Sequence, residues 1–146
     1  MNYKNIDEEV LTSVYKNAHI ALQSIADVIK ETDDEKMKEE LTDEYDGYER
    51  FIGKLSSYMK EIGCEPKDIG VFQKAFMYTS IKMNTLTDDS TSHIAELMIK
   101  GTVMGITELT EILNKHENEL SKTTASLTKE LLLLEESYEQ RLKKLL

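Results

Sequence analysis

Apolar residues recur every three or four positions along most of the chain, in segments separated by short polar breaks. This spacing places the apolar residues on one face of an α-helix, and no segment shows the alternation typical of a β-strand. Only one proline and six glycines occur in 146 residues, so little interrupts the helices. The sequence therefore predicts an all-α protein with four long helices, over residues 7–31, 35–63, 90–118 and 120–145, and a shorter helix over residues 67–86.

The lengths of the connections favour one topology. Each long helix has about 25 to 29 residues, or roughly 38 to 43 Å at a rise of 1.5 Å per residue. The first two and the last two long helices are joined by short breaks, which predicts two antiparallel hairpins. The connection between the hairpins has about 27 residues and can return the chain along the bundle. We expect one domain over residues 1–146, a four-helix bundle whose long crossover contains the fifth helix; a five-helix up-and-down bundle is the competing arrangement.

Composition excludes several classes of protein. The net charge of -10 opposes binding to nucleic acid, which needs a basic face, and to an anionic membrane surface. No apolar run approaches the roughly 20 residues of a membrane span. The first residues lack the apolar core of a signal peptide, and Cys64 has no second cysteine with which to form a disulfide. We therefore expect a cytoplasmic protein.

Two short segments carry a resemblance to a known family. They are Glu44-Tyr45-Asp46-Gly47 on the second long helix and Glu135-Glu136-Ser137-Tyr138 on the last one. With the helix lengths, they make the chain similar to the ferritin-like superfamily, whose di-metal members bind two ions through Glu-x-x-His on two helices and a carboxylate on each of the others. The glutamates match this pattern, whereas Gly47 and Tyr138 stand in the positions of the histidines.

Glu44 and Glu108 are the carboxyl groups predicted to face the core, about 12 Å apart along the bundle axis. That separation is too large to bridge one pair of metal ions, which lie about 4 Å apart. A buried carboxylate without a partner is costly and tends to be protonated. We therefore expect hydrogen bonds from tyrosine hydroxyls or an ion pair with Arg141; the candidate tyrosines are Tyr45, Tyr48 and Tyr138.

The alternative for the same region is a binding site for a single metal ion. Glu44, Glu135 and His19 are predicted to lie at similar heights in the bundle. Carboxylate oxygen and imidazole nitrogen are suitable ligands for iron, manganese or zinc. No other cofactor is predicted, and no catalytic residues are predicted because no acid, base and nucleophile can be placed together.

Gly101 and Gly105 are both predicted to face inward on the helix over residues 90–118. Each glycine costs about 1 kcal/mol relative to alanine inside a helix, so a compensating gain is expected. That gain is either close packing against another helix or space for a ligand.

Apolar residues outside the core-facing stripes predict a homodimer. They are Ala95, Ile99, Val103, Ile106, Leu113, Leu132 and Leu133. Three functions are compatible with the sequence. The first is a non-catalytic bundle that acts through protein contacts, the second a metal-binding protein, and the third a small-molecule binder that uses space beside the two glycines.

Overall fold

The computed structural model describes residues 3–65 and 90–146 of the chain. Within these residues every regular element is a helix and none is a strand, which confirms the all-α prediction for them. The predicted helix over residues 67–86 lies outside them. The elements are α1 (Tyr3–Val28), η1 (Ile29–Glu31), α2 (Glu35–Glu61), α5 (Thr91–His116), η3 (Glu117–Glu119) and α6 (Lys122–Lys143).

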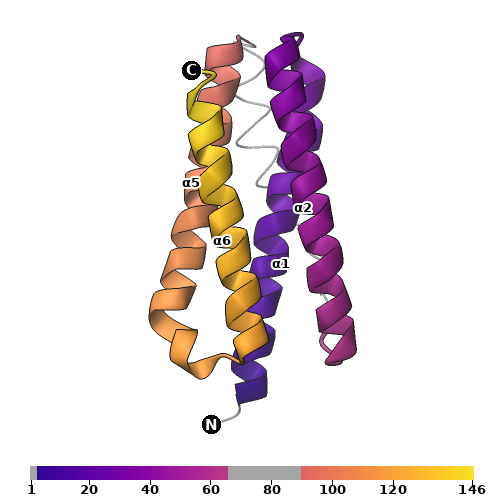
Figure 1. Cartoon of the computed structure of the whole chain (residues 1–146), viewed down its shortest axis with the longest axis vertical. Helices are drawn as coiled ribbons and strands as arrows, with labels where there is room; N and C mark the ends of the chain where they lie inside the picture. The colour runs from indigo at the N-terminus through magenta and orange to yellow at the C-terminus, as the bar shows by residue number, and fades with distance from the viewer. Residues whose placement is uncertain (1–2, 66–89) are drawn as a thin grey trace.

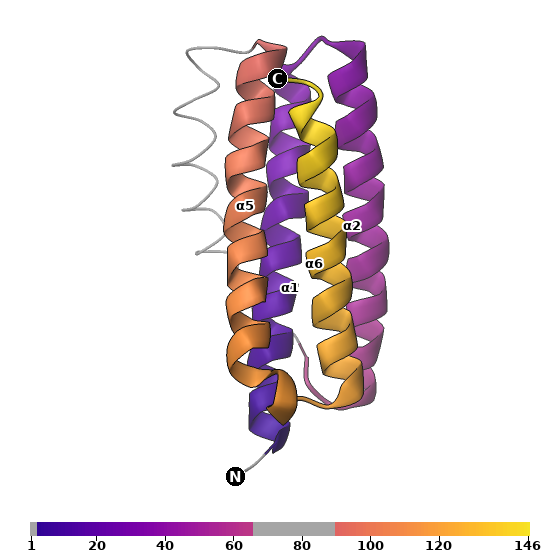
Figure 2. The same cartoon turned by 60° about the vertical axis from the view of Figure 1, so that its left-hand side comes forward.

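The four α-helices lie side by side as a bundle (Figure 1). α1 and α2 form one antiparallel hairpin, and α5 and α6 form the other (Figure 2). α1 and α6 run toward one end of the bundle, whereas α2 and α5 run toward the opposite end. Each helix therefore has antiparallel neighbours.

The core is built from stripes of buried residues spaced by three and four positions, the spacing that keeps side chains on one helix face. The stripe of α2 contains Met37, Leu41, Glu44, Tyr48, Phe51 and Leu55, and that of α6 contains Thr124, Thr128, Leu131, Glu135, Tyr138 and Leu142. Polar residues stand in the stripes near the middle of three helices: Asn17, Glu44 and Glu135. An otherwise apolar core thus contains a polar layer.

Side chains outside the helices satisfy the free amides at the helix ends. Asp34 accepts a hydrogen bond from the backbone N–H of Met37 at 3.0 Å and begins α2. Ser90 and Ser121 do the same for α5 and α6. After α2 the chain turns at Gly63, whose φ of 75° suits glycine.

Several apolar residues predicted to lie outside the core have a different environment. Ala95 is buried in the core, and Ile99 and Leu132 are partly buried and pack against it. Val103 and Leu133 are exposed, as is Met104 on α5. Among the described residues, no helix is both long and apolar enough to cross a membrane.

The cap of α2 gives a direct test of this fold. We expect Asp34→Ala to lower the free energy of unfolding by about 1 kcal/mol, because an amide at the start of α2 loses its acceptor. The neighbouring residue Asp33 is exposed, so Asp33→Ala should change it by less than about 0.5 kcal/mol. Urea unfolding followed by circular dichroism measures both; equal effects would contradict the assigned start of α2.

Candidate functional site

The polar layer contains two buried carboxyl groups from different hairpins. Glu44 of α2 and Glu135 of α6 are each only 1 % exposed. Between them lies Tyr48, which is also buried and donates a hydrogen bond from its hydroxyl to Oε2 of Glu135 at 3.2 Å. The tyrosine thus links the α1–α2 hairpin to α6.

The second oxygen of Glu135, Oε1, is buried and has no hydrogen-bond partner within residues 3–65 and 90–146. Burial raises the pKa of Glu135 well above its ordinary value. The hydrogen bond from Tyr48 opposes this shift, and the negative charge of Glu108 adds to it. Burial therefore favours the protonated form of Glu135.

Asn17 of α1 and Gly105 of α5 lie next to the unpartnered oxygen of Glu135. The Asn17 side-chain amide donates to the backbone oxygen of Gly105 and to Oε1 of Glu108, both at 3.1 Å. Its own oxygen, Oδ1, is buried and has no partner. A Cβ atom on residue 105 would lie 2.5 Å from Oε1 of Glu135 and 3.2 Å from Oδ1 of Asn17. The two acceptors are therefore neighbours, and only glycine leaves room for them.

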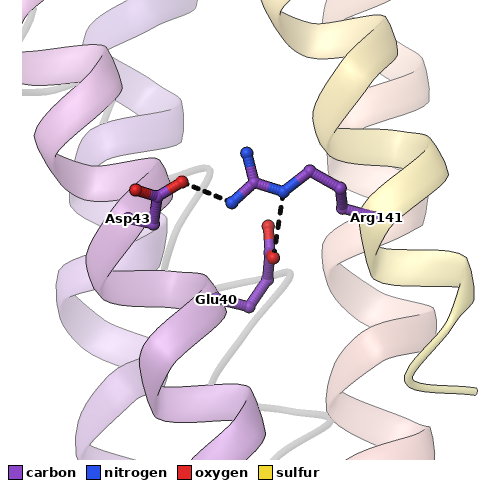
Figure 3. A network of polar contacts seen from close by, with 3 residues as sticks. All are labelled: Glu40, Asp43 and Arg141. Carbon is purple, nitrogen blue, oxygen red and sulfur yellow. Dashed lines mark hydrogen bonds and ion pairs between the residues drawn. The ribbon is translucent and has the colours of Figure 1, made fainter.

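Figure 3 shows Arg141 with the carboxyl groups of Glu40 and Asp43, and the charges of these three residues act on the buried Glu44. The Arg141 guanidinium binds Oε1 of Glu40 at 3.1 Å and also donates to Asp43. Burial raises the pKa of Glu44 to about 10, and a hydrogen bond with Glu40 and the charge of Glu40 add to this effect. A proton on Glu44 supplies the donor for the hydrogen bond with Glu40.

Gly47 and Tyr138 pack directly against each other. A Cβ atom on residue 47 would overlap the Tyr138 hydroxyl and lie 3.1 Å from Cζ of its ring. The ring is buried, and the Arg141 guanidinium lies 5.2 Å above it. Gly47 and Tyr138 therefore fill a single space together, at the two positions where the ferritin-like pattern has histidines.

A cavity of about 610 Å³ lies between α1 and α5 and reaches the polar layer. Glu44, Tyr48 and Glu135 contribute to its wall from α2 and α6. Its other lining residues from the described part of the chain are Ser13, Lys16, Asn17, Ile20, Ala21, Ser24 and Ile25 of α1, and Leu97, Met98, Lys100, Gly101, Thr102, Met104, Gly105 and Glu108 of α5. Gly101 is exposed, and a Cβ atom there would meet nothing within 4 Å. Gly101 was predicted to face inward, and this prediction is wrong, whereas Gly105 is approached closely by Glu135 and Asn17; both glycines line the cavity.

The structure brings together two of the three residues of the predicted metal site, Glu44 and Glu135, but not His19. Glu44 and Glu135 line the same cavity, whereas His19 is half-buried and packs against the Tyr15 ring at 4.4 Å. Burial lowers the pKa of His19. In the part of the chain that the structure describes, no group of three or more His, Cys, Asp or Glu side chains could hold a metal ion.

Two expectations about the carboxyl groups need correction. Glu108 was expected to be buried, but it is exposed beside the buried Leu109, because the apolar residues Val103 and Met104 face outward and made the stripe look wider. Among the expected partners of Glu44, Tyr48 bonds to Glu135 instead, and Arg141 pairs with Glu40.

Asn17 and Glu40 are the site residues that sequence reasoning missed. A signal for Asn17 was present, since it stands three residues after Val14 in the buried stripe of α1. A polar residue at such a position needs a partner from another helix.

Comparison with protein-family models, with curated proteins and with solved structures finds no match to this chain. The chemistry of the site therefore has to follow from its own side chains.

The raised pKa of Glu44 makes stability depend on pH. The folded state keeps the proton up to about pH 10, whereas the unfolded chain loses it near pH 4.5, so stability falls as the pH rises between these values. One such proton contributes a slope of about 1.4 kcal/mol per pH unit. We expect Glu44→Gln to reduce the slope by about this amount between pH 6 and 8, measured by urea unfolding.

The control for this experiment is Glu49→Gln, which removes a carboxylate from the exposed face of the same helix. This variant should keep the slope of the wild-type protein. An unchanged slope in Glu44→Gln would show that Glu44 is ionised in the folded protein.

The close contact of Gly47 and Tyr138 predicts a second effect on stability. Gly47→Ala should lower the free energy of unfolding by about 1–3 kcal/mol, because the added methyl group displaces a buried ring. Gly53→Ala on the same helix should instead raise it by up to about 1 kcal/mol, since a Cβ atom at residue 53 meets nothing within 4 Å.

Adding Tyr138→Phe to Gly47→Ala removes the hydroxyl that overlaps the methyl group and should recover part of the loss. Thermal and urea unfolding measure all the variants. A stabilising Gly47→Ala substitution would contradict the packing described for this pair.

Proposed function

We propose that this chain binds a small molecule inside its helix bundle, in the cavity between α1 and α5. One observation carries the proposal: this cavity is lined by buried polar oxygens that have no hydrogen-bond partner among the residues that the structure describes. Its volume of about 610 Å³ is within the range of roughly 300–1,000 Å³ typical of small-molecule sites.

The cavity combines the two kinds of surface that a small-molecule site needs. Apolar side chains of α1 and α5, among them Ile20, Ile25 and Leu97, supply area for apolar contact. Oδ1 of Asn17 and Oε1 of Glu135 supply polar groups that can orient a ligand. Buried polar atoms in native proteins are normally satisfied, so these two oxygens favour a ligand with hydrogen-bond donors.

We also infer that the bundle has the ferritin-like topology. The support is that α2 and α5 run in the same direction, so the connection between them has to span the length of the bundle. The ligand-binding proposal does not depend on this inference, because topology alone does not imply a function.

The other functional hypotheses have less support from the site. The metal-binding hypothesis names Glu44, Glu135 and His19, but His19 is not among the described residues that line the cavity. Protein contacts and a homodimer stay predictions, supported by the exposure of Val103 (40 %), Met104 (58 %) and Leu133 (67 %). Cytoplasmic location, lack of catalysis and lack of nucleic-acid binding also stay predictions.

The proposal is tested with N-phenyl-1-naphthylamine, a neutral apolar dye that becomes fluorescent in apolar sites. We expect the wild-type protein to bind one dye per chain. Gly101→Leu should weaken binding at least tenfold, because its side chain extends into the cavity from a position where no atom obstructs it.

Gly53→Leu is the matched control, since it makes the same substitution in a helix at an exposed residue that does not line the cavity. This variant should bind the dye as the wild-type protein does. Absence of stoichiometric binding to the wild-type protein, or equal binding by both variants, would contradict the proposal.

A further inference from the structure

We infer that the ligand of this cavity is an amphiphilic amine, with its ammonium group between Glu135 and Asn17 and its apolar part along α1 and α5. This inference rests on the proposed function and names the chemical class of the ligand. It depends on three features of the cavity: the polar atoms beside Gly105, the course of the cavity along α1 and α5, and the charged side chains that line it.

The buried polar atoms of the cavity that lack a partner in the described part of the chain are oxygens. Oε1 of Glu135 and Oδ1 of Asn17 are buried, line the cavity and lie close together beside Gly105. Two nearby donors are engaged, because Tyr48 donates to Glu135 and the Asn17 amide donates to Gly105 and Glu108. An ammonium group has three N–H donors and no acceptor, so it complements the oxygens of Asn17 and of an ionised Glu135. A carboxylate or phosphate ligand would bring further acceptors to these oxygens.

The cavity extends along α1 and α5 from the polar layer. Asn17 bonds to Gly105 and Glu108, so these three residues lie at one level. Because α1 and α5 are antiparallel, Ile25 and Leu97 lie to one side of this level, where Ser24 and Lys100 also line the cavity. Residues 17 and 25 of α1 are about 12 Å apart along the helix at 1.5 Å per residue. A ligand with one charged end and an alkyl chain fits this arrangement.

The carboxyl groups of Glu135 and Glu108 attract a cation to this part of the cavity, and the lysine Lys16 in the same lining opposes it. Hydrogen bonds between an ammonium group and a carboxylate are stronger than those between neutral groups, and a nearby cation stabilises the ionised form of Glu135. Glu108 adds a second carboxylate there. The lining also contains Lys16, which is half-buried, and Lys100, which is exposed and pairs with Glu96 at 3.0 Å. The net charge of -10 attracts cations to the protein as a whole.

Isothermal titration calorimetry at pH 7 with three ligands of equal chain length tests the inference. Octylamine, which is protonated at this pH, should bind the wild-type protein at least tenfold more tightly than 1-octanol or octanoate. Equal or tighter binding of octanol would overturn the inference, because it would show that a neutral hydroxyl suffices. Tighter binding of octanoate would overturn it as well.

Two variants locate the ammonium group. Glu135→Gln keeps the shape of the side chain and removes its charge, so it should abolish the preference for octylamine over octanol. Glu108→Gln, which changes an exposed carboxylate lining the same cavity, should reduce that preference less than threefold. A preference that survives in Glu135→Gln would place the ammonium group elsewhere and overturn the assignment. If Glu135→Gln does not fold, the ligand series on the wild-type protein still decides the class.

The same samples separate this inference from the proposed function. Binding of N-phenyl-1-naphthylamine without a preference for octylamine would reject the amine class and leave the cavity as a binding site. Failure of both the dye and all three octyl ligands to bind the wild-type protein would reject both proposals.

Discussion

The burial of two carboxyl groups in a helix bundle is the constraint on which the rest of this structure depends. An isolated ionised carboxylate in an apolar core costs more than the net stability of a typical domain, so Glu44 and Glu135 must be protonated, paired or both. Burial raises the pKa of each, and each also has a polar neighbour: Glu40 for Glu44 and Tyr48 for Glu135. The same constraint favours glycine at residue 105, because a side chain there would collide with the carboxyl group of Glu135.

Polar contacts also set how the two hairpins fit together. Asn17 joins α1 to α5, Tyr48 joins α2 to α6, and Arg141 of α6 binds Glu40 and Asp43 of α2. Apolar stripes can slide by one turn and still bury their side chains, whereas these bonds are satisfied at only one axial shift. The polar layer therefore fixes the register of the hairpins and, with it, the place where α1 and α5 leave a cavity.

Much of the fold could be predicted because helix formation depends on local spacing. The four long segments became α1, α2, α5 and α6 with ends shifted by a few residues, and the break at residue 90 gave the cap of α5. The site was harder, because its contacts depend on the axial shift between hairpins. The pairing of Arg141 with Glu40 joins residues 101 positions apart, and no local pattern encodes such a contact. For Glu108 a local pattern was present but misleading. The exposed apolar residues Val103 and Met104 shifted the predicted centre of the buried stripe of α5, so that Glu108 was predicted to be buried.

The cavity is the part of the structure that the burial of carboxyl groups does not explain. A proton on Glu44 is enough to form the hydrogen bond between Glu44 and Glu40. That pair therefore requires no empty space, and the helices around it could pack at the normal density of a protein interior. A void forfeits van der Waals contacts along its walls, and here it adjoins the oxygens of Asn17 and Glu135 that lack partners. Both deficits occur at one place, and the proposed ligand, with donors at one end and apolar surface along its length, would remove them together. A proton on Glu135 could satisfy the two oxygens but would leave the void, so only a bound molecule answers both.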